Sequence, residues 1–150
     1  MPDGQIINLL LVEDNPQDLM LAQRALRKAG LDHRTHVARD GVEALDFVFC
    51  NGPFAGRNVA AELRVILLDL KLPKIDGLEV LRRIKEDART RIIPVVVLTS
   101  SREQRDVAEA YRLGINSYIV KPVNYELYAE AVRDLGLYWL RLNQPPKVEE

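Results

Sequence analysis

Features that mark several protein classes are scarce in this 150-residue chain. Cys50 is the only cysteine, so no disulfide can form within the chain, and a reducing, cytoplasmic setting is expected. No apolar run is long enough to span a membrane, and the start, Met1-Pro2-Asp3-Gly4, is unlike a signal peptide. These absences argue against a secreted disulfide scaffold and against a membrane protein.

An excess of charge of one sign is also missing. Lys and Arg together number 21 and Asp and Glu 22, which gives a net charge of −1 at pH 7. That balance provides no electrostatic reason for direct DNA binding or for attachment to an anionic membrane. Nucleotide binding is not indicated either, because the chain has neither a Walker-type lysine loop nor a G-x-G-x-x-G sequence.

The chain does contain a regular alternation of apolar, strand-like segments with amphipathic helical ones. This alternation predicts a parallel sheet with right-handed crossovers and helices on both faces. The second strand is the most polar, which places it at an edge and favours the order 2-1-3-4-5 of the flavodoxin-like, doubly wound (βα)5 class of α/β folds. We expect one domain over 6–141, with an extended last helix from Asn124, and a loose tail over 142–150. The expected strands are 6–12, 34–38, 63–68, 92–98 and 117–120.

Polar side chains follow four of these predicted strands. Glu13 and Asp14 come directly after the first strand, and Asp69 after the third. Thr99 follows the fourth strand, and Lys121 follows the fifth. Because ligand sites in open parallel sheets lie outside the carboxyl ends of the strands, we expect these groups to converge on one edge.

The expected cluster favours a divalent cation. Three carboxylates in one pocket repel one another, and a cation relieves that repulsion. Ligands that are all oxygen suit Mg²⁺ or Mn²⁺ better than zinc. With the ammonium of Lys121 and the hydroxyl of Thr99, the pocket would have the parts that hold the oxygens of a phosphoryl group.

Four short motifs at these strand ends resemble the receiver domain of bacterial two-component response regulators. They are Val12-Glu13-Asp14, the segment from Asp69 to Gly77, Val97-Leu98-Thr99-Ser100 and Tyr118-Ile119-Val120-Lys121-Pro122. The resemblance covers residues 6–141. Each motif is weak alone, but four in the right order are specific.

The resemblance implies a role for each acid. Asp69 would accept a phosphoryl group from a histidine kinase and form an acyl phosphate. Asp14 and Asp69 would bind Mg²⁺ directly, and Glu13 would act mainly through a bound water. The backbone carbonyl of Lys71 would complete the protein ligands. The domain would thus assist only its own phosphorylation and dephosphorylation and would not be an enzyme acting on other substrates.

The resemblance also implies how the signal leaves the site. Lys121 would contact the phosphoryl group, Thr99 would be drawn towards it, and Tyr118 would swing inward. The output face would comprise the fourth helix, the fifth strand and the fifth helix. The peptide bond between Lys121 and Pro122 would be cis, a form tolerated before proline.

The chain further resembles the small, stand-alone regulators that are paired with cyanobacterial phytochromes. This resemblance rests on the long segment from Phe47 to Leu63 and on the extended last helix. It makes a bacterial phytochrome a candidate for the histidine kinase partner. No motif assigns a role to the loop over 51–62.

Two other functions compete with this interpretation. A degenerate receiver would bind partners without being phosphorylated, but such proteins typically lose the acid pair, the acceptor or the lysine. A Mg²⁺-dependent phosphatase would also form an aspartyl phosphate, but those enzymes usually carry a second Asp two residues after the nucleophile. Lys71 occupies that position here.

Six apolar residues of the last helix recur at alternating steps of three and four, which is a heptad seam. We expect this seam to form a homodimer, while Leu127, Ala131 and Tyr138 pack on the sheet. The alternative is that the seam is simply the core-facing side of the helix. The seam comprises Tyr125, Tyr128, Val132, Leu135, Trp139 and Leu142.

The two histidines are not expected to bind a metal together. His33 and His36 are three residues apart on the predicted second strand, so they point to opposite faces. Solvated or edge positions are expected for both.

Overall fold

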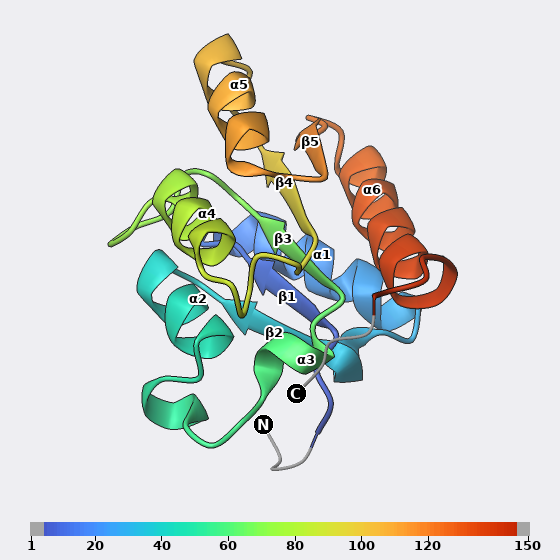
Figure 1. Cartoon of the computed structure of the whole chain (residues 1–150). Helices are drawn as coiled ribbons and strands as arrows, with labels where there is room; N and C mark the ends of the chain where they lie inside the picture. The colour runs from blue at the N-terminus through green and yellow to red at the C-terminus, as the bar shows by residue number, and fades with distance from the viewer. Residues whose placement is uncertain (1–4, 147–150) are drawn as a thin grey trace.

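The computed structural model, which describes residues 5–146, contains one parallel sheet in the order β2-β1-β3-β4-β5 (Figure 1). The predicted flavodoxin-like order is thus confirmed, with the polar second strand at an edge. The first four strands begin one to three residues later than predicted, and the fifth begins where predicted. One reason is visible at Pro94, which has no N–H to donate to a neighbouring strand and directly precedes β4. The strands are β1 (Leu9–Val12), β2 (Thr35–Ala38), β3 (Val65–Leu68), β4 (Val95–Thr99) and β5 (Ser117–Val120).

Helices cover both faces of the sheet, as a doubly wound fold requires (Figure 1). One face carries α1 (Pro16–Lys28), α6 (Tyr125–Leu137) and the π-helical turn η3 (Tyr138–Leu142). The other carries α2 (Gly41–Val48), the short α3 (Val59–Glu62), α4 (Gly77–Glu86) and α5 (Gln104–Leu113). Two 3-10 turns, η1 (Asp32–Arg34) and η2 (Gly52–Phe54), connect the elements near β2. Among the described residues, no helix has both the length and the apolar character to cross a membrane.

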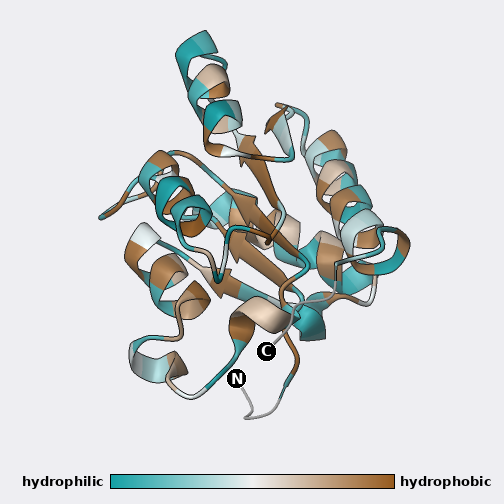
Figure 2. Ribbon diagram, in the orientation of Figure 1, coloured by the Kyte–Doolittle hydropathy of each residue, from teal (hydrophilic) through white to brown (hydrophobic). Residues whose placement is uncertain are grey.

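The core has two layers, one on each side of the sheet. Successive strand residues alternate between them, because side chains of a strand point to opposite faces. Leu10 and Val12 of β1 face the α2–α5 side, while Leu9 and Leu11 face α1 and α6. Figure 2 shows the central strands as continuous apolar segments, and every residue of β1, β3 and β4 is buried.

Four helices begin at side-chain caps that follow a strand. Asn15, Asp40, Asp76 and Asn124 each accept a hydrogen bond from a backbone N–H in the first turn of α1, α2, α4 and α6. Such a cap stabilises a helix by typically about 1 kcal/mol and fixes where it starts. The caps therefore fix where each loop at the carboxyl edge of the sheet ends and the following helix begins.

Four of the six residues of the heptad seam pack against the core of the domain itself, so they are not free to form a dimer interface. Tyr128 is 2% exposed and Val132 is fully buried, and Leu135 and Trp139 pack against the same layer. The alternative interpretation, that the seam is the core-facing side of the helix, holds for these four residues.

The opposite side of α6 is the exposed one. Leu127 and Tyr138, which were expected to pack on the sheet, are 54% and 47% exposed. The reason is the close approach of α6 to α1: a Cβ added at Gly136 would lie 2.9 Å from side-chain carbons of Leu26 and Leu31. Tyr125 and Leu142, at the ends of the seam, are exposed. Homodimer formation stays a prediction, because most of the residues that were expected to form the interface pack inside the domain.

The region around the edge strand β2 also departs from expectation. His36 does lie on an edge strand, but its ring is stacked on Phe47 with centroids 4.2 Å apart and meets Phe54 edge-on. Phe54 belongs to η2, within the loop over 51–62, so part of that loop covers the core. His33 is exposed, as expected, but lies in η1 and not in the strand. Of the tail predicted over 142–150, residues 147–150 lie outside the described part of the chain.

Candidate functional site

The three predicted acids meet at the carboxyl edge of the sheet. Asp69 directly follows β3, and its backbone N–H donates to the carbonyl of Val12 at the end of β1 (3.1 Å). One carboxylate oxygen each from Glu13, Asp14 and Asp69 lies within 4.8 Å of the others. Glu13 and Asp69 are 2% and 6% exposed, whereas Asp14 is exposed. The cluster is therefore buried on one side and open to solvent on the other.

Both carboxylate oxygens of Asp69 are held by hydrogen-bond donors. The hydroxyl of Thr99 donates to Oδ1 (2.8 Å), and the backbone N–H of Lys71 donates to the same oxygen (3.2 Å). The ammonium of Lys121 donates to Oδ2 (2.8 Å). These contacts fix the orientation of the carboxylate, and the predicted association of Asp69, Thr99 and Lys121 is confirmed.

Lys121 is bound to three carboxylates. Its Nζ lies 2.6 Å from Oε1 of Glu13, 2.8 Å from Oδ2 of Asp69 and 2.9 Å from Oδ2 of Asp18. Asp18 was not among the predicted site residues. The only feature of the sequence that pointed to Asp18 was its position as an acid in the first turn of the helix after the first strand.

The charges of the site are unbalanced in favour of the acids. Burial raises the pKa of Glu13 to about 7; the hydrogen bond from Lys121 opposes this rise and the charge of Asp69 adds to it. Burial alone lowers the pKa of Lys121, but its hydrogen bonds to Asp69 and Glu13 outweigh burial and raise it. The ammonium therefore stays charged, and it alone faces several carboxylates. Hard oxygen donors with surplus negative charge are what Mg²⁺ or Mn²⁺ prefers, so the residues present fit such an ion.

A glycine permits the turn that follows Asp69. A Cβ at Gly77 would lie 2.3 Å from the carbonyl oxygen of Asp69 and 2.5 Å from Cα of Leu70, so only glycine fits. The N–H of Gly77 donates to the carbonyl of Leu70 (2.9 Å), which closes the loop. The side chain of Lys71 is exposed in this loop, and a role for its carbonyl as a ligand stays a prediction.

Tyr118 is connected to the site through the loop after β4. Its hydroxyl donates to the carbonyl of Ser101 (3.0 Å), and the N–H of Ser101 is 3.4 Å from Oγ1 of Thr99. Thr99 in turn donates to Asp69. A continuous set of contacts therefore joins Asp69 to β5, while the switch roles of Thr99 and Tyr118 stay predictions.

The peptide bond between Lys121 and Pro122 is trans, so the prediction of a cis bond is wrong. None of the peptide bonds among residues 5–146 is cis. The trans form is favoured before proline by about 0.5–1 kcal/mol. The N–H of Lys121 donates to the carbonyl of Thr99 (2.7 Å), so the β4–β5 pairing reaches the site with the bond in this form.

Comparison with known families settles the class of protein. A family model described as the response regulator receiver domain matches residues 9–133. The chain belongs to this family. The receiver domain is thus a response regulator of two-component signalling, a family that is generally not enzymatic.

Individual relatives cover nearly the whole receiver domain. The probable methanogenesis regulatory protein FilR2 of Methanothrix harundinacea is 44% identical over 138 residues, which span 92% of this chain and 86% of FilR2. The response regulator Rcp1 of Synechocystis is 39% identical over 132 residues, 88% of each chain.

Two solved structures are similarly close. The phosphorylated cyanobacterial phytochrome response regulator RcpA superposes with a TM-score of 0.85 at 38% identity, covering 95% of this chain and 99% of RcpA. The Mn²⁺-bound form of Rcp1 gives 0.84 at 37% identity, covering 93% and 99%. The predicted resemblance to phytochrome-linked regulators is confirmed.

Proposed function

We propose that this receiver domain, over 6–141, accepts a phosphoryl group from a histidine kinase onto Asp69, with Mg²⁺ or Mn²⁺ as cofactor. The observation that carries the proposal is the setting of Asp69. It is buried, both of its oxygens are held by Thr99 and Lys121, and two further acids lie beside it. The Mn²⁺-bound form of Rcp1 supports the choice of cation.

The transfer needs an in-line displacement at phosphorus. One carboxylate oxygen of Asp69 attacks the phosphoryl group of a phosphohistidine, an O–P bond forms, and the P–N bond breaks. The electron pair of that bond stays on the imidazole nitrogen. Lys121 and Thr99 then donate to oxygens of the phosphoryl group. Asp14, Asp69 and the carbonyl of Lys71 would hold the cation directly, Glu13 would act mainly through a bound water, and the cation would supply positive charge for those oxygens.

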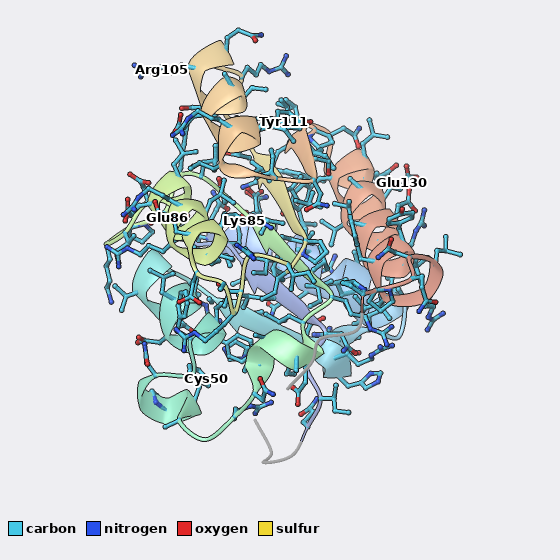
Figure 3. All side chains as sticks on the ribbon, in the orientation of Figure 1. Cys50, Lys85, Glu86, Arg105, Tyr111 and Glu130 are labelled. Carbon is cyan, nitrogen blue, oxygen red and sulfur yellow. The ribbon has the colours of Figure 1, made fainter. Side chains whose placement is uncertain are left out.

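The signal is proposed to leave through α5, β5 and α6. The contacts from Asp69 through Thr99 and Ser101 to Tyr118 support this direction. In α5 only Ala110 is buried, so little apolar packing opposes a shift of this helix. Figure 3 shows Arg105 and Tyr111 on α5, and Glu130 on α6, projecting from this surface, where a partner could contact them.

The partner class is a histidine kinase, and a bacterial phytochrome is the candidate that the names of RcpA and Rcp1 supply. FilR2, named for methanogenesis, is at least as similar in sequence. The proposal therefore names a histidine kinase as the partner, and experiment must identify which sensor that kinase carries. Direct DNA binding and membrane attachment are not part of it.

Intact-protein mass spectrometry after incubation with acetyl phosphate and Mg²⁺ tests the proposal. Wild type should gain one phosphoryl group (about 80 Da for one PO₃H unit), and EDTA should abolish the gain. Asp69→Asn should gain nothing, while the exposed control Asp134→Asn should behave as wild type. A gain in Asp69→Asn would place the acceptor elsewhere. No gain in wild type, even with phosphorylated histidine kinases as donors, would favour the phosphorylation-independent binding module.

A further inference from the structure

The third partner of Lys121 has no place in the proposed transfer described above. We propose that Asp18 is a positioning residue: it holds the ammonium of Lys121 at the site when the acid cluster of Glu13, Asp14 and Asp69 takes up a cation. The inference rests on the proposed function and assigns a role to a carboxylate of α1.

The hydrogen-bond geometry separates Asp18 from the other two partners. A lysine ammonium has three donors, and Lys121 has one carboxylate for each of them. Two of the three, Glu13 and Asp69, belong to the acid cluster that fits a cation, and Asp18 does not. Asp18 is therefore the one partner of the ammonium that is not also a candidate metal ligand.

The position of Asp18 is fixed by the fold. It lies in the first turn of α1, where its backbone N–H donates to the side chain of the N-cap Asn15 (3.0 Å). One residue later, Leu19 is buried in the layer between α1 and the sheet. The side chain of Asp18 is 26% exposed, and the side chain of Lys121 beside it is 9% exposed.

Electrostatic repulsion between the cation and the ammonium of Lys121 explains why a third carboxylate is needed. A divalent cation and an ammonium that share two carboxylates repel each other, and the repulsion is strong in a largely buried site. A cation held directly by Asp69 and through a water by Glu13 would compete for lone pairs of both carboxylates and weaken their hold on Lys121. The charge of Asp18 keeps the ammonium in place, ready to donate to an incoming phosphoryl oxygen. Without that charge, Lys121 would leave the site whenever the cation is bound.

Nitrogen-15 NMR of the lysine ammonium tests the inference on unphosphorylated protein. In wild type the Lys121 signal should show an ordered, slowly exchanging ammonium both with EDTA and with saturating Mg²⁺. Asp18→Asn should match wild type in EDTA, where Glu13 and Asp69 still hold the ammonium, and lose the ordered signal when Mg²⁺ is added. A general loss of structure would instead affect both conditions.

Two further variants control for charge and for helix stability. Asp18→Glu keeps the carboxylate and should restore the ordered signal with Mg²⁺. Glu126→Gln removes an acid from the first turn of α6, so it matches the loss of helix-dipole stabilisation without touching Lys121, and it should leave the signal unchanged. At saturating Mg²⁺, phosphorylation of Asp18→Asn by acetyl phosphate should be about tenfold slower, less than the 10²–10³ lost with a whole charge-stabilising donor.

The outcomes separate this inference from the proposed function. An ordered Lys121 signal in Asp18→Asn with Mg²⁺, in a protein whose wild type binds Mg²⁺ and is phosphorylated, would overturn the role of Asp18 alone. Failure of wild type to bind Mg²⁺ would overturn both. Loss of the signal only when Asp18→Asn meets Mg²⁺, with rescue in Asp18→Glu, is the expected result.

Discussion

In the middle of the sheet, β1, β3 and the first four residues of β4 bury only apolar side chains, whereas at their carboxyl ends the chain buries Glu13, Asp69 and Thr99. The distance between these regions is one or two residues along each strand. Leu68 is fully buried among apolar neighbours, and the next residue, Asp69, is almost as buried among charges.

The two regions differ in what their burial does to stability. Removing apolar surface from water stabilises the fold by roughly 25 cal/mol per Å². Burying a carboxylate costs free energy unless a partner compensates it, and here one ammonium serves three acids. The raised pKa of Glu13 records that cost. We infer that the middle of the sheet stabilises a site whose own charges do not.

The largest effect is expected in the middle of the sheet. Leu67→Ala should lower the free energy of unfolding by about 3–4 kcal/mol, because it leaves a cavity at a position that is 1% exposed. Urea unfolding measures it. Leu127→Ala, at a 54% exposed position, is the matched control and should change stability by less than about 1 kcal/mol. Equal losses in the two variants would contradict the assignment of α6 faces.

A smaller loss is expected at the charged edge. Lys121→Met should lower the free energy of unfolding by about 2 kcal/mol in EDTA, since it leaves buried carboxylates without their partner. Mg²⁺ should recover part of this loss and none of the loss in Leu67→Ala. Insensitivity of Lys121→Met to Mg²⁺ would remove the distinction between the two regions.

Tyr128 and Tyr118 provide a further test of the difference between the two regions, because their hydroxyls differ in hydrogen bonding. The hydroxyl of Tyr128 is buried without a partner among the described residues, whereas that of Tyr118 donates to Ser101. Tyr128→Phe should therefore raise the free energy of unfolding by about 1 kcal/mol, and Tyr118→Phe should lower it by about 1 kcal/mol. Opposite signs in thermal or urea unfolding are the expected result, and a shared sign would refute this account.

The smallest effect concerns His36, a half-buried polar residue remote from the site. Burial lowers the pKa of His36 below its ordinary value of 6.5. The unfolded chain therefore takes up a proton more readily, so the contribution of His36 to stability is complete above pH 6.5 and is lost as the pH falls below it. His36→Gln should flatten this part of the stability profile between pH 7 and 5, and the exposed control His33→Gln should not. Identical slopes in wild type and His36→Gln would show that burial does not act on this group.

The parts of the site that the sequence predicted share one property: each is decided by a residue and its immediate neighbours. Glu13, Asp69 and Lys121 follow short apolar strands, Thr99 is the last residue of one, and a parallel sheet aligns the ends of those strands. The caps, such as Asn15 and Asp76, are equally local.

The parts that the sequence missed depend on packing between distant segments. The seam of α6 has an apolar period whether it faces another chain or its own core, and the close approach at Gly136 decides between the two. Asp18 is an ordinary first-turn acid until α1 places it beside Lys121, 103 residues away along the chain. His36 is a polar residue of an edge strand until η2 brings Phe54 over it.

The sequence by itself thus determined the order of strands and helices, the identity of the acids and the family. It could do so because strand periodicity, helix caps and the side chains that follow each strand are properties of short segments. The tertiary structure decided which face of α6 is buried and that Lys121 has a third carboxylate. Those features depend on free-energy differences between alternative packings of the whole domain, and short segments do not contain them.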